Sequence, residues 1–236
     1  MAYVGGKAKA ADHILEVLND PLFDGMDYME PFVGYAHVLR RVENKRSYAA
    51  SDSNSLLLTL LRAVRDRKRL PTVDAREYAR LKHGAANTLK RAVAAFTYSY
   101  AGKEWGGYTD VYYRNGKYNS YADERKRYYA ELADNPQFQR ARLRCCDYRN
   151  LRPHGKLIYC DPPYANTTGY NSEVFDSDEF WRVVREWSDT NIVLVSEYAA
   201  PRDFRCVASR IKHSSISQKT RRRERLFVHQ RHAPLF

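Results

Sequence analysis

The feature that most constrains the fold is a repeated local pattern, in which a short apolar run ends in a polar turn. "DYME" runs into Pro31-Phe32-Val33-Gly34, "SYAAS" ends at Asp52, and "KLIYC" ends at Asp161-Pro162-Pro163-Tyr164. Helical patterns stand between or beside these runs, in "AKAADHILEVLND", "SLLLTLLRAVRD" and "DEFWRVVREW". Strands that alternate with helices predict an α/β sheet with helices on both faces.

A second feature is the interruption of this alternation by residues 65–135. Residues 72–100 and 121–134 have helical patterns, whereas 101–120 is rich in glycine, aromatic and polar residues without a helical period. Further strands are expected in "RARLRCCDY" and "NIVLVSEY", and a hairpin is expected from Ile211 onward. We therefore expect a main domain of residues 1–64 and 136–236, with 65–135 inserted as a mostly helical subdomain.

The charge balance predicts a polyanionic partner. The chain has 40 Lys and Arg against 28 Asp and Glu, a net charge of +12. Its basic stretches carry aromatic rings, as in "DVYYRNGKYNSYADERKRYY" and "QKTRRRERLF", and the chain has 19 tyrosines. Cations and flat rings together suit phosphates and bases, which favours nucleic acid over a merely basic soluble protein.

The hydropathy and the cysteine spacing disfavour a membrane-spanning, secreted or zinc-binding protein. No apolar run is long enough to span a membrane, and "MAYVGGKAKAADH" has no signal-peptide core. The cysteines are Cys145, Cys146, Cys160 and Cys206, and none form a C-x-x-C pair or stand beside histidine at zinc-ligand spacing. We interpret them as reduced core thiols of a cytoplasmic protein without a metal.

The strand ends predict a ligand site, because open α/β sheets bind ligands beyond the carboxyl ends of their strands. Asp52 follows the Gly34 turn at roughly 20 residues, the spacing at which an acid reaches the ribose of a nucleoside cofactor. At Asp161-Pro162-Pro163 the prolines remove backbone donors and fix φ, so neither helix nor sheet continues. The turn either terminates a strand or holds a carboxylate, carbonyl acceptors and the Tyr164 ring rigidly.

Several motifs together carry a resemblance to a known family. They are "YVGGK" (Tyr3 to Lys7), "EPFVG" (Glu30 to Gly34), "SDSN" (Ser51 to Asn54) and "YCDPPY", in that order. In this the chain resembles the Dam-like DNA adenine-N6 methyltransferases of bacteria and phages. "SSISQKTRRRERLF" is similar to the closing strands of that family, and "YAGKEWGGY" to a segment of its phage members. The resemblance covers nearly the whole chain.

This resemblance implies a Rossmann-like seven-stranded methyltransferase sheet, the cofactor S-adenosylmethionine and double-stranded DNA as substrate. Residues 1–64 and 136–236 would form the catalytic, cofactor-binding domain, and 65–135 the target-recognition subdomain. The implied cofactor residues are Tyr3 and Lys7 in an N-terminal loop, Phe32 and Gly34 lining the cleft, Asp52 at the ribose, Asp147 or Tyr148 at the adenine, and Asp161 between cofactor and target.

The DPPY turn suits methylation of an amine. The adenine N6 lone pair is delocalised into the ring, and acceptors that bind both amine hydrogens make that nitrogen more nucleophilic. Asp161 offers a carboxylate, Pro162 a carbonyl oxygen on the turn that Pro163 stiffens, and Tyr164 a ring that stacks on the base. The chemistry requires no metal, but the base must be flipped out of a duplex.

Residues for gripping DNA are expected in 101–120 and in the basic tail. The candidates are Lys103, Trp105, Tyr108, Tyr112, Tyr113, Arg114, Asn115, Lys117 and Tyr118, together with Arg221, Arg222 and Arg223. Arg114 and Asn115 are suited to reading base edges in the major groove. The alternative is that half of the tyrosines pack the subdomain core and that the tail arginines are a solvated edge.

The chain departs from the family pattern at Tyr35-Ala36-His37, where members usually carry more glycine. Larger residues there are expected to crowd the backbone's approach to the cofactor, unless they are neutral variation. Three alternatives stay open: cytosine-N4 methylation, methylation of RNA adenine, and a DNA-binding module with a degenerate cofactor site. The recognition sequence, the oligomeric state and any restriction partner are also left open.

Overall fold

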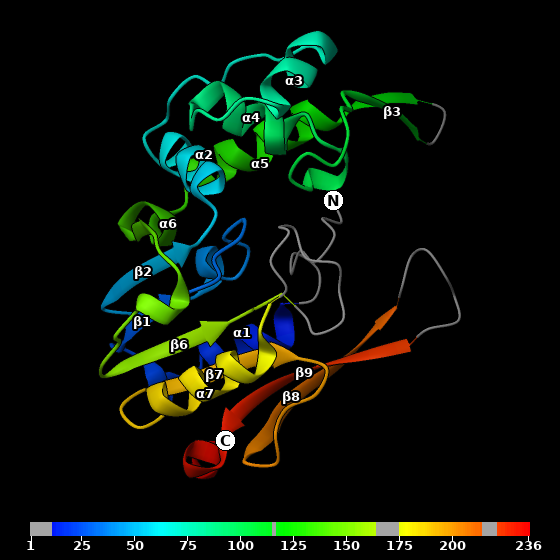
Figure 1. The fold of residues 1–236 in the computed structure, drawn as a ribbon. Helices are drawn as coiled ribbons and strands as arrows, with labels where there is room; N and C mark the ends of the chain where they lie inside the picture. Colours follow the sequence, from blue (N-terminus) through cyan, green and yellow to red (C-terminus); the bar gives the residue numbers. More distant parts are fainter. Residues whose placement is uncertain (1–10, 115–116, 164–174, 214–220) are drawn as a thin grey trace.

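The computed structural model describes residues 11–114, 117–163, 175–213 and 221–236. Its main sheet has seven strands in the order β5-β2-β1-β6-β7-β9-β8. Their bounds are β1 Asp27–Glu30, β2 Ser47–Asp52, β5 Arg142–Cys145, β6 Lys156–Cys160, β7 Ile192–Glu197, β8 Phe204–His213 and β9 Arg221–His229. The predicted α/β class and the Rossmann-like seven-stranded sheet are confirmed (Figure 1).

The strand order creates one switch point in the middle of the sheet. β1 pairs in parallel with both β2 and β6, so that Met29 lies between Ala49 and Ile158. β5, β2, β1, β6 and β7 are parallel, whereas β9 runs antiparallel to both β7 and β8. The carboxyl ends of β2, β1 and β6 therefore open at one edge, where loops diverge to opposite faces.

Side chains alternate between two apolar layers along these strands, as the period of a β-strand requires. Tyr28, Leu157 and Leu194 face one cluster, which also holds α1 (Asp12–Leu18) and α2 (Ser55–Arg65). The other cluster holds their strand neighbours, including Met29, Ile158 and Val193, and the apolar face of α7 (Ser177–Trp187). Helices thus cover both faces, and Trp181 and Trp187 are buried on α7.

The residues between α2 and β5 form a helical layer beyond the edge of the sheet (Figure 1). It contains α3 Ala75–Lys82, α4 Leu89–Thr97, the hairpin β3 Val111–Arg114 and β4 Lys117–Ser120, α5 Tyr121–Ala133 and α6 Pro136–Arg140. Asp74, Thr88 and Ser120 cap α3, α4 and α5 with their side-chain oxygens. These elements match the mostly helical segment expected at 65–135, and its status as a separate domain stays a prediction.

Short 3-10 helices complete the described chain. They are η1 Pro21–Phe23, η2 Leu39–Arg41, η3 Tyr100–Gly102, η4 Tyr148–Asn150 and η5 Gln230–Leu235. Within the described ranges, no helix is long and apolar enough to cross a membrane. The same ranges contain no group of three or more His, Cys, Asp or Glu placed to hold a metal ion.

One expectation about the strands is wrong. The C-terminal hairpin begins at Phe204 rather than at Ile211, because a bulge between Cys206 and Ala208 shifts the register and obscures the alternation. Within residues 101–120, which have no helical period, Val111–Arg114 pairs with Lys117–Ser120 as the β3–β4 hairpin.

The interpretation of all cysteines as core thiols is also wrong. All four cysteines are free, but only Cys160 is buried, and Cys145 and Cys206 are exposed. The physical reason is their position: Cys145 lies on β5 and Cys206 on β8, the two edge strands of the sheet. Only Cys160, on the central strand β6, has neighbouring strands on both sides and helices on both faces.

One buried cation joins α5 to the end of α4. Arg125 is 5% exposed, and its Nη1 donates hydrogen bonds to the carbonyl oxygens of Phe96, Thr97 and Ser99 at 2.8, 2.7 and 2.7 Å. These carbonyls belong to the end of α4 and the turn after it, where backbone acceptors lack helical partners. Arg125 thereby fixes the start of the segment that leads to the β3–β4 hairpin.

We expect Arg125→Met to lower the free energy of unfolding by about 2–4 kcal/mol, because several buried carbonyls lose their charged donor. Urea unfolding followed by circular dichroism measures this loss. Arg127→Met on the same helix is the matched control, since Arg127 is exposed, and its loss should stay below about 0.5 kcal/mol. Equal losses in the two variants would contradict the assignment.

Candidate active site

The switch-point edge of the sheet brings the β1 turn and Asp52 into direct contact. The Val33 N–H donates to the Ser51 carbonyl oxygen at 2.9 Å, and the Gly34 N–H donates to Oδ2 of Asp52 at 3.2 Å. The Asn54 N–H donates to Oδ1 of Asp52 at 3.0 Å. Each carboxylate oxygen keeps a further lone pair, so Asp52 can still accept hydrogen bonds from a ligand.

Gly34 leaves open space beside this carboxylate. Its φ is +48°, in the left-handed region, and among the described residues no atom beyond its chain neighbours lies within 4 Å of the place that a Cβ would take. Glycine adopts this conformation without steric cost and exposes its backbone to a ligand. The pair of an open glycine turn and a strand-end carboxylate fits the ribose and backbone contacts of a nucleoside cofactor.

Burial raises the pKa of Asp52 above its ordinary value. The hydrogen bonds from the Asn54 and Gly34 amides act in the opposite direction, and the negative charge of Glu104 raises the pKa further. Donors from a bound ligand would stabilise the charged carboxylate, since hydrogen bonds to the ionised form favour it.

Tyr35 and Ala36 stand where members of the family usually carry glycine, and the structure shows where the large Tyr35 side chain lies. The Tyr35 side chain is buried away from the sheet edge, where its hydroxyl donates to the Gly102 carbonyl oxygen at 3.1 Å and its ring stacks on Tyr129. Tyr128 in turn donates its hydroxyl to the Tyr35 carbonyl oxygen at 2.6 Å. The large ring thus anchors the β1 loop to the helical layer and does not fill the space beside Gly34. Ala36 takes φ +58°, a conformation that glycine adopts more easily.

The proline turn follows β6 directly at the same edge. Asp161 is half-buried, Pro162 is buried and Pro163 is exposed. On the neighbouring strand end, Glu30 is only 2% exposed, and its Oε2 has no hydrogen-bond partner within the described part of the chain. Burial raises the pKa of Glu30 well above its usual range, the charge of Asp161 raises it further, and a hydrogen bond with the Leu39 backbone opposes both. Burial and the Asp161 charge therefore both favour the neutral form of Glu30.

An aromatic cluster borders this edge on the α7 side. The Phe32 and Tyr148 rings lie 5.2 Å apart, and both contact Phe180 edge-on. Asp147 is instead held by Arg149, whose Nη2 donates to Oδ2 of Asp147 at 2.8 Å and lowers the pKa of that carboxyl. The structure therefore brings Phe32 and Tyr148 together, whereas the Asp147 carboxylate is engaged by a cation.

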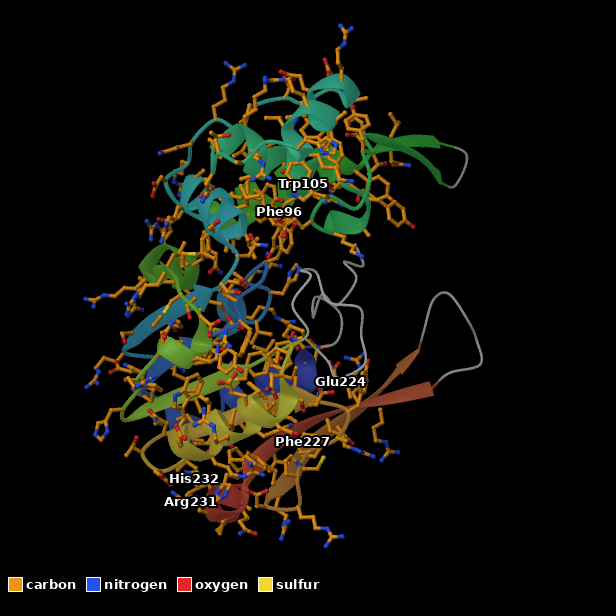
Figure 2. The ribbon with its side chains drawn as sticks, in the orientation of Figure 1. Phe96, Trp105, Glu224, Phe227, Arg231 and His232 are labelled. Carbon is orange, nitrogen blue, oxygen red and sulfur yellow. The ribbon has the colours of Figure 1, made fainter. Side chains whose placement is uncertain are left out.

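Some of the residues expected to bind DNA are packed and others are exposed. Trp105 and Tyr108 both contact the Tyr78 ring edge-on. Trp105 is half-buried within the helical layer (Figure 2), whereas Tyr108 is exposed. Lys103, Lys117 and Arg223 are exposed. Backbone pairing places Arg114 opposite Lys117 on the β3–β4 hairpin, and Arg221 and Arg222 on β9 opposite His213 and Lys212. Figure 1 shows that this hairpin and the far end of β8–β9 project toward the same side of the molecule.

Other predicted residues lie outside the described ranges. They are Tyr3, Lys7, Asn115 and Tyr164. Their assigned roles stay predictions.

One further side chain at this edge, Glu104, is not predicted from the sequence. The Glu104 carboxylate comes from the loop after α4, and its Oε2 accepts a 2.6 Å hydrogen bond from Nδ2 of Asn54. Glu104 is half-buried, and burial raises its pKa. No periodicity could have found this contact, because 50 residues separate the partners along the chain. The only available signal was an acid in the glycine-rich stretch "GKEWGG".

The strand order, the Gly34 turn and Asp52 define the class of Rossmann-like, cofactor-binding methyltransferases. A family model described as D12 class N6 adenine-specific DNA methyltransferase matches residues 3–197. The chain belongs to this family, and the suspected Dam-like relationship is confirmed. It is accordingly an enzyme that uses S-adenosylmethionine as methyl donor.

Comparisons with individual proteins add weaker similarities. No curated protein matches the chain significantly. Among solved structures, the rRNA methyltransferase aviRa from Streptomyces viridochromogenes is 14% identical, with a TM-score of 0.43 over 98% of this chain and 86% of that one. The magnesium protoporphyrin IX methyltransferase ChlM from Synechocystis PCC 6803, with bound SAM, is 9% identical at a TM-score of 0.43, covering 96% of this chain and 80% of that one. A conserved hypothetical protein from Streptococcus pyogenes is 10% identical at 0.43, covering 93% and 94%.

The buried acid Glu30 generates a prediction about pH. Burial raises the pKa of Glu30 in the folded state. Between the pKa of the unfolded chain and that of the folded protein, the folded protein therefore keeps a proton on Glu30 that the unfolded chain has released. Stability contributed by this proton is present at low pH and is lost as pH rises toward the folded-state pKa. We expect Glu30→Gln to be more stable than the parent at pH 8, by about 1 kcal/mol or more, and to lose this advantage toward pH 4.

Thermal unfolding of both proteins across this pH range measures the effect. The exposed control Glu43→Gln should leave the pH dependence unchanged. A constant difference between Glu30→Gln and the parent at every pH would show that Glu30 does not carry the proton.

Proposed function

We propose that this enzyme methylates the N6 amine of adenine in double-stranded DNA, after the target base has been rotated out of the helix. The observation that carries the proposal is the Asp161-Pro162-Pro163 turn at the end of β6, on the edge that also holds Gly34 and Asp52. We also propose that residues 1–64 and 136–236 are the catalytic domain and that 65–135 recognise the target.

The residues at the sheet edge fit the cofactor. Half-buried Gly34 has no described atom within 4 Å of the place that a Cβ would take, and Asp52 offers carboxylate acceptors for the ribose hydroxyls. Phe32 and Tyr148 form an apolar border suited to the adenine ring. Tyr3 and Lys7 are proposed to close the site from the N-terminal loop. S-adenosylmethionine, when bound, supplies an electrophilic methyl group.

Asp161 and Pro162 are proposed to act on the target amine. The Asp161 carboxylate and the Pro162 carbonyl oxygen each accept a hydrogen bond from one N–H of the amine, which concentrates electron density on the nitrogen. The fixed φ of two successive prolines holds both acceptors in place before the base arrives, so little reorganisation accompanies the reaction. Tyr164 is proposed to stack on the base. Burial of the neighbouring Glu30 favours its neutral form, which limits the negative charge beside Asp161.

DNA binding is proposed for the basic side chains on the side to which both hairpins project. Arg114 and Asn115 would read base edges from the β3–β4 hairpin, with Lys103, Tyr108 and Lys117 beside them. Arg221, Arg222 and Arg223 would contact phosphates from β9. The net charge of +12 supports a polyanionic partner. Because the Tyr108 ring packs against Tyr78, only the exposed edge of Tyr108 is proposed to contact DNA.

Cytosine-N4 methylation is the competing reaction on this fold. Relatives of that kind more often carry serine at the first position of the turn, and glutamine-modifying relatives carry asparagine. Asp161 therefore favours adenine. A DNA-binding module with a degenerate cofactor site is disfavoured, because the Tyr35 ring packs away from Gly34 and leaves the site open.

Paired substitutions separate the proposed roles of Asp161 and Asp52. We expect Asp161→Ala to lower kcat by about 100-fold or more, the typical effect of losing one preorganised transition-state contact. Its Kd for S-adenosylmethionine should stay within about 3-fold of the parent's. Asp52→Ala should instead weaken cofactor binding by about 10-fold or more, the effect of losing hydrogen bonds to a charged acceptor.

Isothermal titration with the cofactor and single-turnover methylation of a DNA duplex measure the two effects separately. Retained turnover in a folded Asp161→Ala protein would refute the proposed mechanism. An unchanged cofactor Kd in Asp52→Ala would refute the ribose assignment.

The target base is tested in cells. Plasmid DNA from a strain without its own adenine methylation, expressing this chain, should contain N6-methyladenine by nucleoside mass spectrometry. The Asp161→Ala variant, expressed at the same level, is the control and should give none. N4-methylcytosine in place of N6-methyladenine would keep the site but overturn the proposed base.

A further inference from the structure

Asn54 links two acidic side chains that come from distant parts of the chain. Its Oδ1 caps α2 by accepting the Leu57 N–H at 3.0 Å, and its own N–H donates to Asp52. The remaining amide group, Nδ2, donates to Oε2 of Glu104 at 2.6 Å. The backbone N–H of Asn54 thus holds Asp52, and its side-chain amide holds Glu104.

The charge of Glu104 acts on Asp52. Burial raises the pKa of Glu104, while hydrogen bonds with Asn54 and Trp105 and the charge of Arg91 lower it. Glu104 in turn raises the pKa of Asp52. Within the described chain no ion pair to either carboxyl occurs that would offset this repulsion. Like charges brought together in a partly buried place are unfavourable for the fold, unless donors bind there.

The loop that carries Glu104 is firmly held. The Tyr35 hydroxyl donates to the Gly102 carbonyl oxygen at 3.1 Å, and the Trp105 N–H donates to the Ala95 carbonyl oxygen at 3.1 Å. The Arg91 guanidinium lies over the Trp105 ring, 5.2 Å from its centroid. These contacts fix the loop on both sides of Glu104, so the carboxylate is positioned before any ligand arrives.

We propose that Glu104 is a cofactor-binding residue, which accepts a hydrogen bond from one ribose hydroxyl of S-adenosylmethionine while Asp52 accepts from the other. A ribose carries two adjacent hydroxyl donors, and two carboxylates flanking one small amide match that pair. The segment between α2 and β5, proposed above to recognise DNA, then also supplies part of the cofactor site. This inference rests on the proposed function, because it extends the site that Asp52 and Gly34 define.

The test is the binding of S-adenosylhomocysteine and of its 2′-deoxy and 3′-deoxy analogues, measured by isothermal titration. The parent protein should bind both deoxy analogues more weakly than the ribose compound. Glu104→Ala should weaken S-adenosylhomocysteine binding by about 10-fold, as expected for one hydrogen bond to a charged acceptor. It should also lose discrimination against one of the two deoxy analogues and keep discrimination against the other.

Asp52→Ala should show the reciprocal pattern. Glu104→Gln retains an acceptor oxygen and should recover part of the affinity, which also covers the case in which the alanine variant folds poorly. Glu131→Gln is the matched control, since Glu131 is an exposed acid on α5 that pairs with Arg40, and it should bind all three compounds as the parent does.

The outcomes separate the two proposals. If Asp52→Ala and Glu104→Ala both leave binding unchanged, the cofactor site itself is misassigned. If only Glu104→Ala leaves it unchanged, the proposed function stands and this inference fails. A Glu104→Ala protein that weakens all three compounds by the same factor also overturns it, because Glu104 would then act only by positioning Asn54.

Discussion

The structure depends on the parallel pairing of β1 with both β2 and β6. Because β1 is flanked on both sides, the turns after three strands emerge at one edge, and backbone amides from one turn reach the carboxylate of the next. The hydrogen bond from the Gly34 N–H to Asp52 is the direct product of this arrangement. Gly34, Asp52 and Asp161, which carry the proposed cofactor and target chemistry, each lie at or within a few positions of one of these strand ends.

Buried acids at this edge oppose the stability of the fold, and they fit the proposed function of the edge. Glu30, Asp52 and Glu104 all have pKa values raised mainly by burial. A core optimised only for stability would replace such groups by apolar ones, because removing polar groups from water is unfavourable without full hydrogen bonding. Their presence at one edge fits the proposed site, where a bound ligand would supply further donors, because perturbed acids tend to occur at functional sites.

The helical layer is attached to the site by specific contacts. Tyr35, in a position where the family usually has glycine, donates to Gly102 and stacks on Tyr129, and Glu104 accepts from Asn54. Tyr35, which was expected to crowd the cofactor, therefore anchors the helical layer to the loop after β1. This anchoring places the β3–β4 hairpin and the cofactor edge in one connected structure, a suitable arrangement for an enzyme that must bring a base to a methyl donor.

Local pattern in the sequence determined the elements and their class. The apolar runs before Gly34, Asp52 and Asp161 predicted three neighbouring strand ends, and the order of the motifs predicted the family and the cofactor. Tertiary structure alone decided what pattern cannot encode. The bulge at Cys206 hid seven residues of β8 from periodicity, edge position exposed Cys145 and Cys206, and long-range packing brought Glu104 to Asn54. Periodicity reports which face of an element is apolar, but only the packed chain shows which distant polar groups meet, because those contacts depend on how the elements are assembled.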